Sequence, residues 1–505
     1  IAPWLEKALQ RMPIFANAGI KRVINGAIPH TPDGNPLAGP APGLRNFWQC
    51  CGSSIGIAQG AGIGKYLAQW MVHGDAEINM HCTDPRRFGA YADPDYTRAK
   101  SFDDYENMFE TPLPGREIQA GRPSRVTPLY EALKTRGAVY TEVYGWERPK
   151  YFAPEGFEEN LQYRRNNVFD IVAEECRAVR ERVGIMDLSS FAKFDVSGPG
   201  AEALLDQLTA NRLPQKPGGI NLTHMLSDNG RIEGEWTITR LAEDRFYVLS
   251  GAGTERMALD QLAFAAGGDV TVANVTDDFG MLVVAGPKSR AVLAPLTNAD
   301  LSNASFRWLS GREILIAGIP VRALRVNYVG ELGWELHAPM GQLAALYSAI
   351  REAGEAHGIA DFGVQAVNSL RMEKGYRGYG AELTNEITLI EAGCTRFYAP
   401  DKGAFKGRSA TEAVREQGIA TKLVYGEVAA ADCDIYGGEA VMQGGRVVGV
   451  CTSGGYGHAT GKSLAFAYVD PDAAEGLEVV ILGERRALTL LDTPVWDPTN
   501  ARQKA

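Results

Sequence analysis

The sequence has 505 residues, of which 45% are hydrophobic and 22% charged, which is the balance of a folded protein with room for two to four domains. Its formal net charge of -10 argues against a nucleic-acid backbone as the main partner, since that affinity needs an excess of Lys and Arg. Seven scattered cysteines without a CxxC pair indicate neither a disulfide framework nor a zinc or redox motif.

Targeting and metal-binding patterns are also missing from the sequence. No stretch approaches the ~18 consecutive apolar residues of a membrane span, and the first residues lack the zones of a signal peptide. The seven histidines never occur at HxxxH spacing, so no metal site is indicated. We therefore expect an intracellular protein, located in the cytoplasm or, in a eukaryote, in the mitochondrial matrix.

Proline, glycine and charge patterns divide the chain into four parts, with boundaries expected at residues 1–80, 81–158, 159–409 and 410–505. In the first part, residues 45–50 predict a strand, followed by a tight turn and a helix that ends near Gly74. The adjacent Cys50 and Cys51 are expected to be buried as small hydrophobic residues.

Small residues crowd the turn and the start of this helix, which would let a flat ligand approach the backbone. A helix start also offers unpaired N–H groups and a partial positive charge. Because the GxGxxG spacing is absent, the spacing alone favours a plainer explanation, namely close packing of the helix on a sheet.

The remaining parts differ in their periodicity. Residues 81–158 are rich in Arg, Tyr, Asp and Pro with little sustained pattern, which predicts a connector. The third part mixes predicted strands at 245–250 and 321–329 with a helix over 341–358, as in a large α+β domain. From residue 410, short β-like runs between glycine-bearing turns predict a small all-β domain.

The string NGAIPHTPDGNPLAGPAPGLRNFWQCCGSSIGIAQGAGIGKYLAQWMVHGD resembles the closing segment of the FAD domain in the dimethylglycine and sarcosine dehydrogenase family. The resemblance implies that the TPDG-type loop lies near the active site and that the strand, turn and helix contact the flavin. The cofactor-binding residues implied are Asp33, Gly34, Gly52, Ser53, Ser54, Ile55 and Gly56. The dinucleotide-binding strand and glycine loop that open such a domain are absent, so we expect an upstream FAD-binding segment or subunit as a partner.

Further strings follow the aminomethyltransferase (glycine-cleavage T-protein) pattern in order. They are ECRAVRERVGIMDLSSFAKFDVSGPGAEALLDQL, LVVAGPKSR, YVGELGWELHAP and SLRMEKGYRGYGAELTNEITLIEAG, continued by TSGGYGHATGKSLAFAYV. The implied fold is α+β: the end of a FAD-dependent oxidoreductase domain, its central domain, a folate-binding T-protein-like domain and a C-terminal β-barrel.

Tetrahydrofolate presents the donor edge of its pterin, which one carboxylate can accept as paired hydrogen bonds. The family match puts this carboxylate at Glu335 and leaves Glu331, four residues earlier, open between a folate contact and a strand-end salt bridge. The match also aligns Glu235 with the acid/base that acts near the folate nitrogens. Three further residues are expected to line the folate site: Tyr328, Arg377 and Tyr379.

Some positions depart from the T-protein pattern. Leu222 replaces an aromatic residue, Gly251 an asparagine and Val367 an arginine, while Glu235 stands where an aspartate is usual. The departures at Leu222 and Gly251 support an alternative in which this half has lost folate and serves as a structural or partner-binding module.

The resemblance implies an FAD-dependent enzyme that oxidises the N-methyl group of a small amino acid of the dimethylglycine or sarcosine type. The one-carbon unit would then pass to tetrahydrofolate, with an electron acceptor as a further partner. A third possibility is an aminomethyl- or methyltransferase without flavin chemistry. The residues that would select the substrate lie outside the matched segment.

Overall fold

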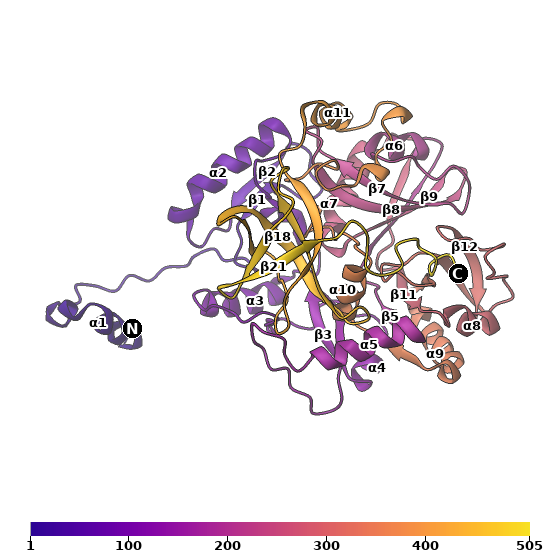
Figure 1. Ribbon diagram of the computed structural model, residues 1–505. Coiled ribbons are helices and arrows are strands. Elements are labelled where there is room, and N and C mark those ends of the chain that lie inside the picture. The colour runs from indigo at the N-terminus through magenta and orange to yellow at the C-terminus, as the bar shows by residue number, and fades with distance from the viewer. Residues whose placement is uncertain (1) are drawn as a thin grey trace.

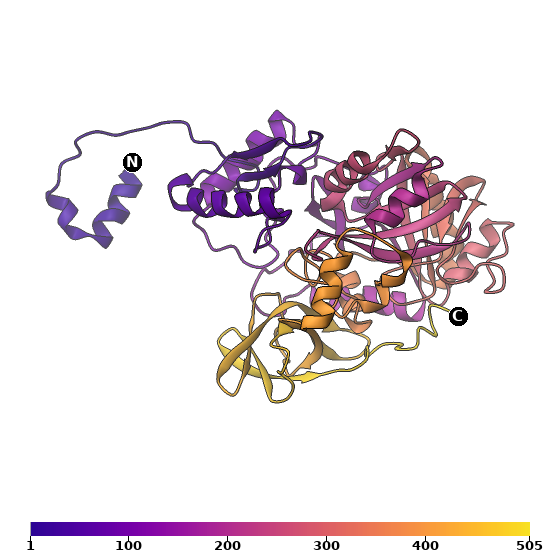
Figure 2. The same ribbon diagram turned by 90° about the horizontal axis from the view of Figure 1, so that it is seen from above.

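The computed structural model describes residues 2–505. Figures 1 and 2 show an N-terminal part that projects to one side, a larger body built on two sheets, and a barrel that packs against this body. The projecting part contains α1 (Ala2–Arg11), η1 (Pro13–Asn17), β1 (Leu37–Pro40), β2 (Trp48–Cys51) and α2 (Gly56–His73).

Helix α2 has the end that the sequence predicts. Gly74 adopts a left-handed conformation with φ 84° and donates its N–H to Trp70 O, as expected for a glycine after a helix C-terminus. Only Leu67 of the helix is buried. The expectation that Cys50 and Cys51 are buried is wrong, because β2 pairs only with β1 and leaves both cysteines exposed.

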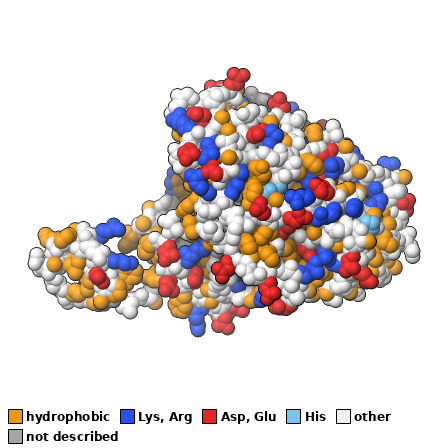
Figure 3. Space-filling model, turned by 60° about the horizontal axis from the view of Figure 1, so that its bottom comes forward, with side chains coloured by type: hydrophobic (Ala, Val, Ile, Leu, Met, Phe, Trp, Pro, Cys, Tyr) orange, Lys and Arg blue, Asp and Glu red, His pale blue; other side chains and the backbone are white. Residues whose placement is uncertain are grey.

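Apolar side chains are unusually exposed in this N-terminal part. Trp4, Ile14, Ile24 and Ile57 are among them, and Figure 3 shows hydrophobic atoms spread over the projecting lobe at its left. Among the described residues, no helix combines the length and the apolar character that crossing a membrane requires.

The connector is more regular than its sequence suggests. It contains η2 (His81–Thr83), η3 (Pro85–Arg87), α3 (Pro94–Asn107), α4 (Tyr130–Thr135) and the hairpin of β3 (Ala138–Val143) and β4 (Trp146–Phe152). Helix α3 begins after Asp93, whose side chain accepts the N–H groups of Asp95 and Tyr96. The sequence of α3 has no apolar stripe. The helix is stabilised instead by its cap and by polar contacts such as the Lys100–Glu142 ion pair.

The large domain is built on two sheets. The first has the order β10-β6-β9-β8-β7, with β6 (Ala192–Ser197), β7 (Ile220–Leu226), β8 (Ile232–Ala242), β9 (Arg245–Ser250) and β10 (Thr271–Asn274). The second has the order β12-β13-β14-β11-β5-β15, with β5 (Val183–Asp187), β11 (Phe279–Ala285), β12 (Gly311–Ile316), β13 (Ile319–Leu324), β14 (Gly333–Pro339) and β15 (Ile359–Asp361).

The expected strand 321–329 ends early, at Leu324. Beyond it the side chain of Asn327 accepts the N–H groups of Val329 and Gly330, which turns the chain away from the sheet.

Helices cover both sheets. They are α5 (Phe169–Glu181), α6 (Ala201–Leu208), α7 (Glu255–Ala265), α8 (Ser289–Leu293), α9 (Leu343–Gly354), α10 (Val364–Glu373) and α11 (Arg408–Gln417). Short 3-10 turns occur at η4 (Ala252–Thr254), η5 (Ala294–Leu296), η6 (Met340–Gln342), η7 (Glu355–His357), η8 (Thr395–Phe397) and η9 (Pro400–Lys402).

The C-terminal part is all-β, as the sequence predicts, and closes into a barrel of order β16-β19-β18-β17-β20-β21. Its strands are β16 (Lys422–Val428), β17 (Ala440–Gln443), β18 (Arg446–Gly457), β19 (Lys462–Val469), β20 (Leu477–Ile481) and β21 (Glu484–Leu490). The amide of Asn368 on α10 donates to Gly454 O on β18, which ties the barrel to the large domain.

Candidate functional site

Glu335 on β14 is a largely buried carboxyl group without a hydrogen-bond donor among the described residues; its side chain is 14% exposed. Burial raises its pKa to about 8. The nearest basic group is His337, whose Nε2 lies 3.8 Å from Glu335 Oε2. Burial lowers the pKa of His337 well below its usual range, so this imidazole is neutral and does not offset the carboxylate. Glu335 is therefore free to accept donors from a ligand.

Glu235 lies on β8 opposite His224 of β7, and His224 Nε2 is 3.2 Å from Glu235 Oε2. The imidazole is fully buried and its Nδ1 has no partner in the described part of the chain. Sequence reasoning overlooked His224. His224 lies four residues before the turn at Asp228–Gly230 and Glu235 five residues after it, and a register shift between Met225 and Leu226 brings the two opposite each other.

Tyr328, Arg377 and Tyr379 lie together beside Glu235. The hydroxyl of Tyr328 donates to Arg377 O, and that of Tyr379 donates to Glu233 O at 2.6 Å. Burial raises the pKa of both tyrosines, and the charge of Glu235 adds to the rise in each. The buried Nε of Arg377 has no partner within residues 2–505. The structure thus brings together Glu235 and the three residues expected to line the site.

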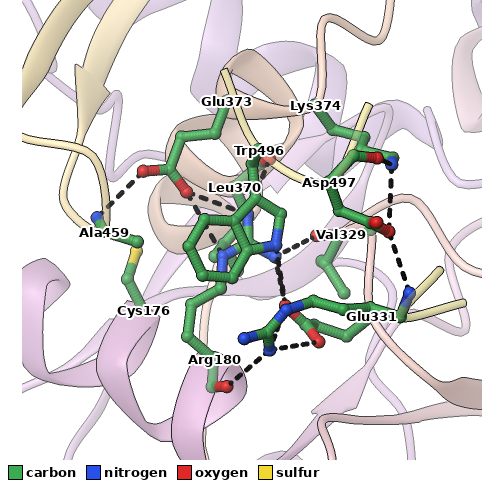
Figure 4. A network of polar contacts seen from close by, with 12 residues as sticks. Cys176, Arg180, Val329, Glu331, Leu370, Glu373, Lys374, Ala459, Trp496 and Asp497 are labelled. Atoms are coloured by element: carbon green, nitrogen blue, oxygen red, sulfur yellow. Dashed lines mark hydrogen bonds and ion pairs between the residues drawn. The ribbon is translucent and has the colours of Figure 1, made fainter. Parts of the chain in front are cut away.

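Glu331 is placed differently, in the buried network of Figure 4. Its carboxylate is 1% exposed and lies 3.0 Å from Arg180 and 3.1 Å from Arg502. The indole N–H of Trp496 also donates to it, at 2.9 Å. With these partners in place, the contacts of Glu331 favour a role in holding the fold over contact with folate.

The three residues that depart from the T-protein pattern, Leu222, Gly251 and Val367, differ in how closely they are packed. A Cβ added at Gly251 would meet no described atom within 4 Å, so the position is open. Leu222 is half-buried on β7 opposite Thr237, and Val367 packs against an apolar cluster beneath α10.

Asp33 and Gly34, expected near the flavin, form a tightly held turn. Both oxygens of Asp33 accept from Arg87, at 2.7 and 2.9 Å. Gly34 has φ 69°, and a Cβ there would lie 2.5 Å from a carboxylate oxygen of Asp104. Their contacts within the chain fix the loop, and only a glycine fits at the second position.

The start of α2 is open. Gly52 has φ 74°, and Ser53 Oγ donates to Gln59 at 3.2 Å, whereas a Cβ at Gly56 would approach only Ser53 Oγ, at 3.9 Å. At Gly60, Gly62 and Gly64 a Cβ would meet no described atom within 4 Å. Packing inside this chain therefore does not explain the glycines at positions 56, 60, 62 and 64. No side chain caps the helix either. The backbone N–H groups of its first turn, which begins at Gly56 after Ser54 and Ile55, are therefore available to a flat anionic cofactor.

Residues 52–56 also match the GxSxG spacing of serine hydrolases, between a strand and a helix. Ser54 makes no hydrogen bond to a histidine in the described structure, so the triad that such an enzyme needs is not formed. Residues 2–505 also contain no group of three His, Cys, Asp or Glu side chains arranged to hold a metal ion.

Four family models match the chain in order. They are the FAD dependent oxidoreductase over residues 1–70, its central domain over 73–127, the GCVT N-terminal domain over 129–402 and the glycine cleavage T-protein C-terminal barrel domain over 422–497. Mouse mitochondrial dimethylglycine dehydrogenase is 39% identical over 99% of this chain and 59% of its own length. Human mitochondrial sarcosine dehydrogenase is 33% identical over 99% of this chain and 60% of its own.

The chain belongs to the family of the GCVT N-terminal domain, whose model matches more than half of it, and over 99% of its length it is similar to dimethylglycine and sarcosine dehydrogenases. Its fold agrees with a solved structure of aminomethyltransferase T from Bartonella henselae, with a TM-score of 0.65 and 25% identity over 74% of this chain and 98% of that one. The expected family and fold class are thereby confirmed. The chain spans about 60% of the length of the dehydrogenases it matches.

Within this family arrangement, the domain boundaries expected at residues 81, 159 and 410 stay predictions. The GCVT model begins at residue 129, ahead of the expected boundary. Tyr151 on β4 is 1% exposed and packs in one apolar cluster with Val172 of α5 and Phe362, so the β3–β4 hairpin shares the core of the large domain.

Proposed function

We propose that this chain is the folate-handling part of an FAD-dependent dehydrogenase that removes an N-methyl group from a small amino acid of the dimethylglycine or sarcosine type. The one-carbon unit would pass to tetrahydrofolate. The observation that carries the proposal is Glu335, a largely buried carboxyl group with no donor of its own, which lies beside His337 and near Tyr247. A buried polar group without a partner is costly, so its retention favours a ligand that supplies donors.

Each group has a distinct part in this proposal. Glu335 accepts the paired N–H donors of the pterin edge, and the geometry of a carboxylate suits two parallel hydrogen bonds. Glu235, with His224 at 3.2 Å, can take up and return a proton at its Oε2 as the one-carbon unit joins the folate nitrogens. Tyr328, Arg377 and Tyr379 lie beside Glu235 and would orient the ligand there.

FAD, when bound, would supply the two-electron oxidation of the N-methyl group. The first turn of α2 offers its uncapped N–H groups to the ring, and the glycines leave room for close approach. The proposed partners of the chain are an FAD-binding segment or subunit and an electron acceptor. The mitochondrial names of the related dehydrogenases support a location in the matrix if the source is a eukaryote.

A second candidate is a structural or partner-binding role for a T-protein-like half that has lost folate. Gly251 favours it, because the space beside this residue is open where the T-protein pattern carries an asparagine side chain. Leu222 favours it as well, since it replaces an aromatic residue of the pattern.

Calorimetric titration of the 505-residue chain with 5-formyltetrahydrofolate, an air-stable reduced folate, separates the two candidates. We expect saturable binding with a Kd in the micromolar range, on the order of −8 kcal/mol. If a folded chain shows no binding up to millimolar ligand, folate capture is ruled out and the structural role takes its place.

A further inference from the structure

The C-terminal segment leaves the barrel and lies across the T-protein-like domain (Figures 1 and 4). Trp496 and Arg502 both donate to the buried carboxylate of Glu331, at 2.9 and 3.1 Å. The guanidinium groups of Arg180 and Arg502 lie over the indole ring of Trp496, at 4.4 and 4.5 Å from its centroid. These contacts hold the segment firmly along its length.

Beyond these contacts, the backbone of the last residues is held by two arginines. Arg325, which is 1% exposed, donates to Gln503 O at 3.1 Å and to Ala505 O at 2.7 Å. Arg290 donates to Ala505 O as well, at 2.7 Å. Gln503 is thereby buried, with 2% exposure, whereas its neighbour Lys504 remains exposed.

The side chain of Gln503 reaches the candidate folate site through two tyrosines. Its Oε1 accepts the hydroxyl of Tyr376 at 2.9 Å. The ring of Tyr376 is stacked on that of Tyr328, with centroids 5.5 Å apart and an interplanar angle of 30°. Tyr328 donates in turn to Arg377 O beside Glu235. A continuous set of contacts thus runs from the C-terminal segment to the residues around the site.

We propose that Gln503 is a positioning residue of the folate site, which sets the orientation of the Tyr376–Tyr328 pair against the aromatic rings of a reduced folate. This inference rests on the proposed function. A hydroxyl that is fixed by a buried acceptor leaves its ring one orientation, so the surface offered to the ligand is formed before binding. The C-terminal segment is then part of the binding site as well as of the fold.

The test uses calorimetry to compare the affinity of five variants of the 505-residue chain for 5-formyltetrahydrofolate, four single ones and the double variant that combines Gln503→Met with Tyr376→Phe. Gln503→Met keeps the size of the side chain and removes the acceptor, Gln503→Glu keeps an acceptor, and Tyr376→Phe removes the donor. Lys504→Met is the matched control in the same segment, since its side chain donates to Thr499 O and lies over the ring of Trp308, with no contact to Tyr376 or Tyr328. Melting temperatures are recorded for all five.

We expect Gln503→Met and Tyr376→Phe each to weaken binding about five- to tenfold, the scale of one lost hydrogen bond. The double variant should lose no more than either single one, because both remove the same contact. Gln503→Glu and Lys504→Met should bind within about twofold of the unchanged chain.

Wild-type affinity in Tyr376→Phe, or equal losses in Gln503→Met and Gln503→Glu, would assign Gln503 to the fold alone and overturn the inference. Absence of folate binding in the unchanged chain would overturn the proposed function and the inference together. The binding of the unchanged chain therefore tells the two failures apart.

Discussion

His224 Nε2 lies 3.2 Å from Glu235 Oε2 across the β7–β8 hairpin, in a position where the imidazole is fully buried and the carboxylate is only partly so. The buried His224 orients the partly exposed Glu235, which is the arrangement expected of an acid/base group held for proton transfer. Removing a carboxylate placed in this way should lower the reaction rate more than the affinity for folate.

We therefore predict that Glu235→Ala lowers the rate at which the chain joins formaldehyde to tetrahydrofolate by about 10²-fold, while the Kd for folate changes less than about twofold. Formaldehyde serves as the one-carbon source, so the redox step is not needed. Product is followed by coupling to a methylenetetrahydrofolate dehydrogenase. Glu427→Ala, on a partly exposed ion pair of the barrel, is the control. Equal rates in Glu235→Ala and the unchanged chain would contradict the role.

Glu335→Gln should weaken folate binding by roughly 2–4 kcal/mol, on the order of a hundredfold, since it loses a charge-assisted bond and sets an amide donor against the pterin donors. Folding should be nearly unaffected, because Glu335 has no hydrogen-bond donor among residues 2–505. Calorimetry measures the affinity and thermal unfolding the stability. The surface variant Glu478→Gln should match the unchanged chain in both.

Folate affinity should depend on pH through Glu335, whose pKa burial raises to about 8. At neutral pH most of the free chain carries the protonated group, whereas pterin donors favour the carboxylate. Binding therefore releases a proton, and affinity should rise by up to about tenfold per pH unit below pH 8 and level off above it. Titration in two buffers with different ionisation enthalpies counts the proton. The slope should vanish in Glu335→Gln; its persistence there would point to another group.

Glu331→Gln should destabilise the large domain by about 3 kcal/mol, because Arg180 and Arg502 lose a buried counter-charge. The exposed Glu174→Gln, which also breaks two arginine pairs, should cost less than about 1 kcal/mol. Urea unfolding gives both values. The folded Glu331→Gln chain should keep its folate affinity, and a large loss would restore the binding role expected from the sequence.

Gly56→Val should reduce FAD retention in protein that includes a dinucleotide-binding segment, because the added side chain obstructs the open start of α2. In the 505-residue chain the same change should leave the melting temperature within about 2 °C, since a Cβ at Gly56 approaches only Ser53 Oγ, at 3.9 Å. Flavin absorbance after gel filtration measures retention. Undiminished retention would show that α2 does not approach the cofactor closely.

Local patterns in the sequence predicted much of the fold. Helix α2 and its end at Gly74 follow from apolar spacing and a glycine stop, and the barrel strands follow from short β-like runs between glycines. Helix α3 was not predicted, because a cap and ion pairs stabilise it and its sequence has no apolar stripe that would indicate a helix.

The candidate site was predictable only in part. Motif resemblance identified Glu235 and Glu335 as site residues. It left the role of Glu331, four residues before Glu335, open between a folate contact and a salt bridge. What separates them is Arg180 and Arg502, which are 151 and 171 residues away from Glu331 in the chain. The link from Gln503 to Tyr376 spans 127 residues and has no local pattern at all.

The network around Glu331 also has a consequence for folding during translation. Arg502 donates to the backbone of Arg180, a residue that leaves the ribosome 322 positions earlier. At roughly 5–20 residues per second, this interval lasts about 16–64 s. Throughout that time the backbone carbonyl of Arg180 lacks this donor, and Glu331, once translated, still lacks Arg502. Completion of this domain must wait until Trp496 and Arg502 are translated, so products stalled before them are the species that we expect chaperones to bind.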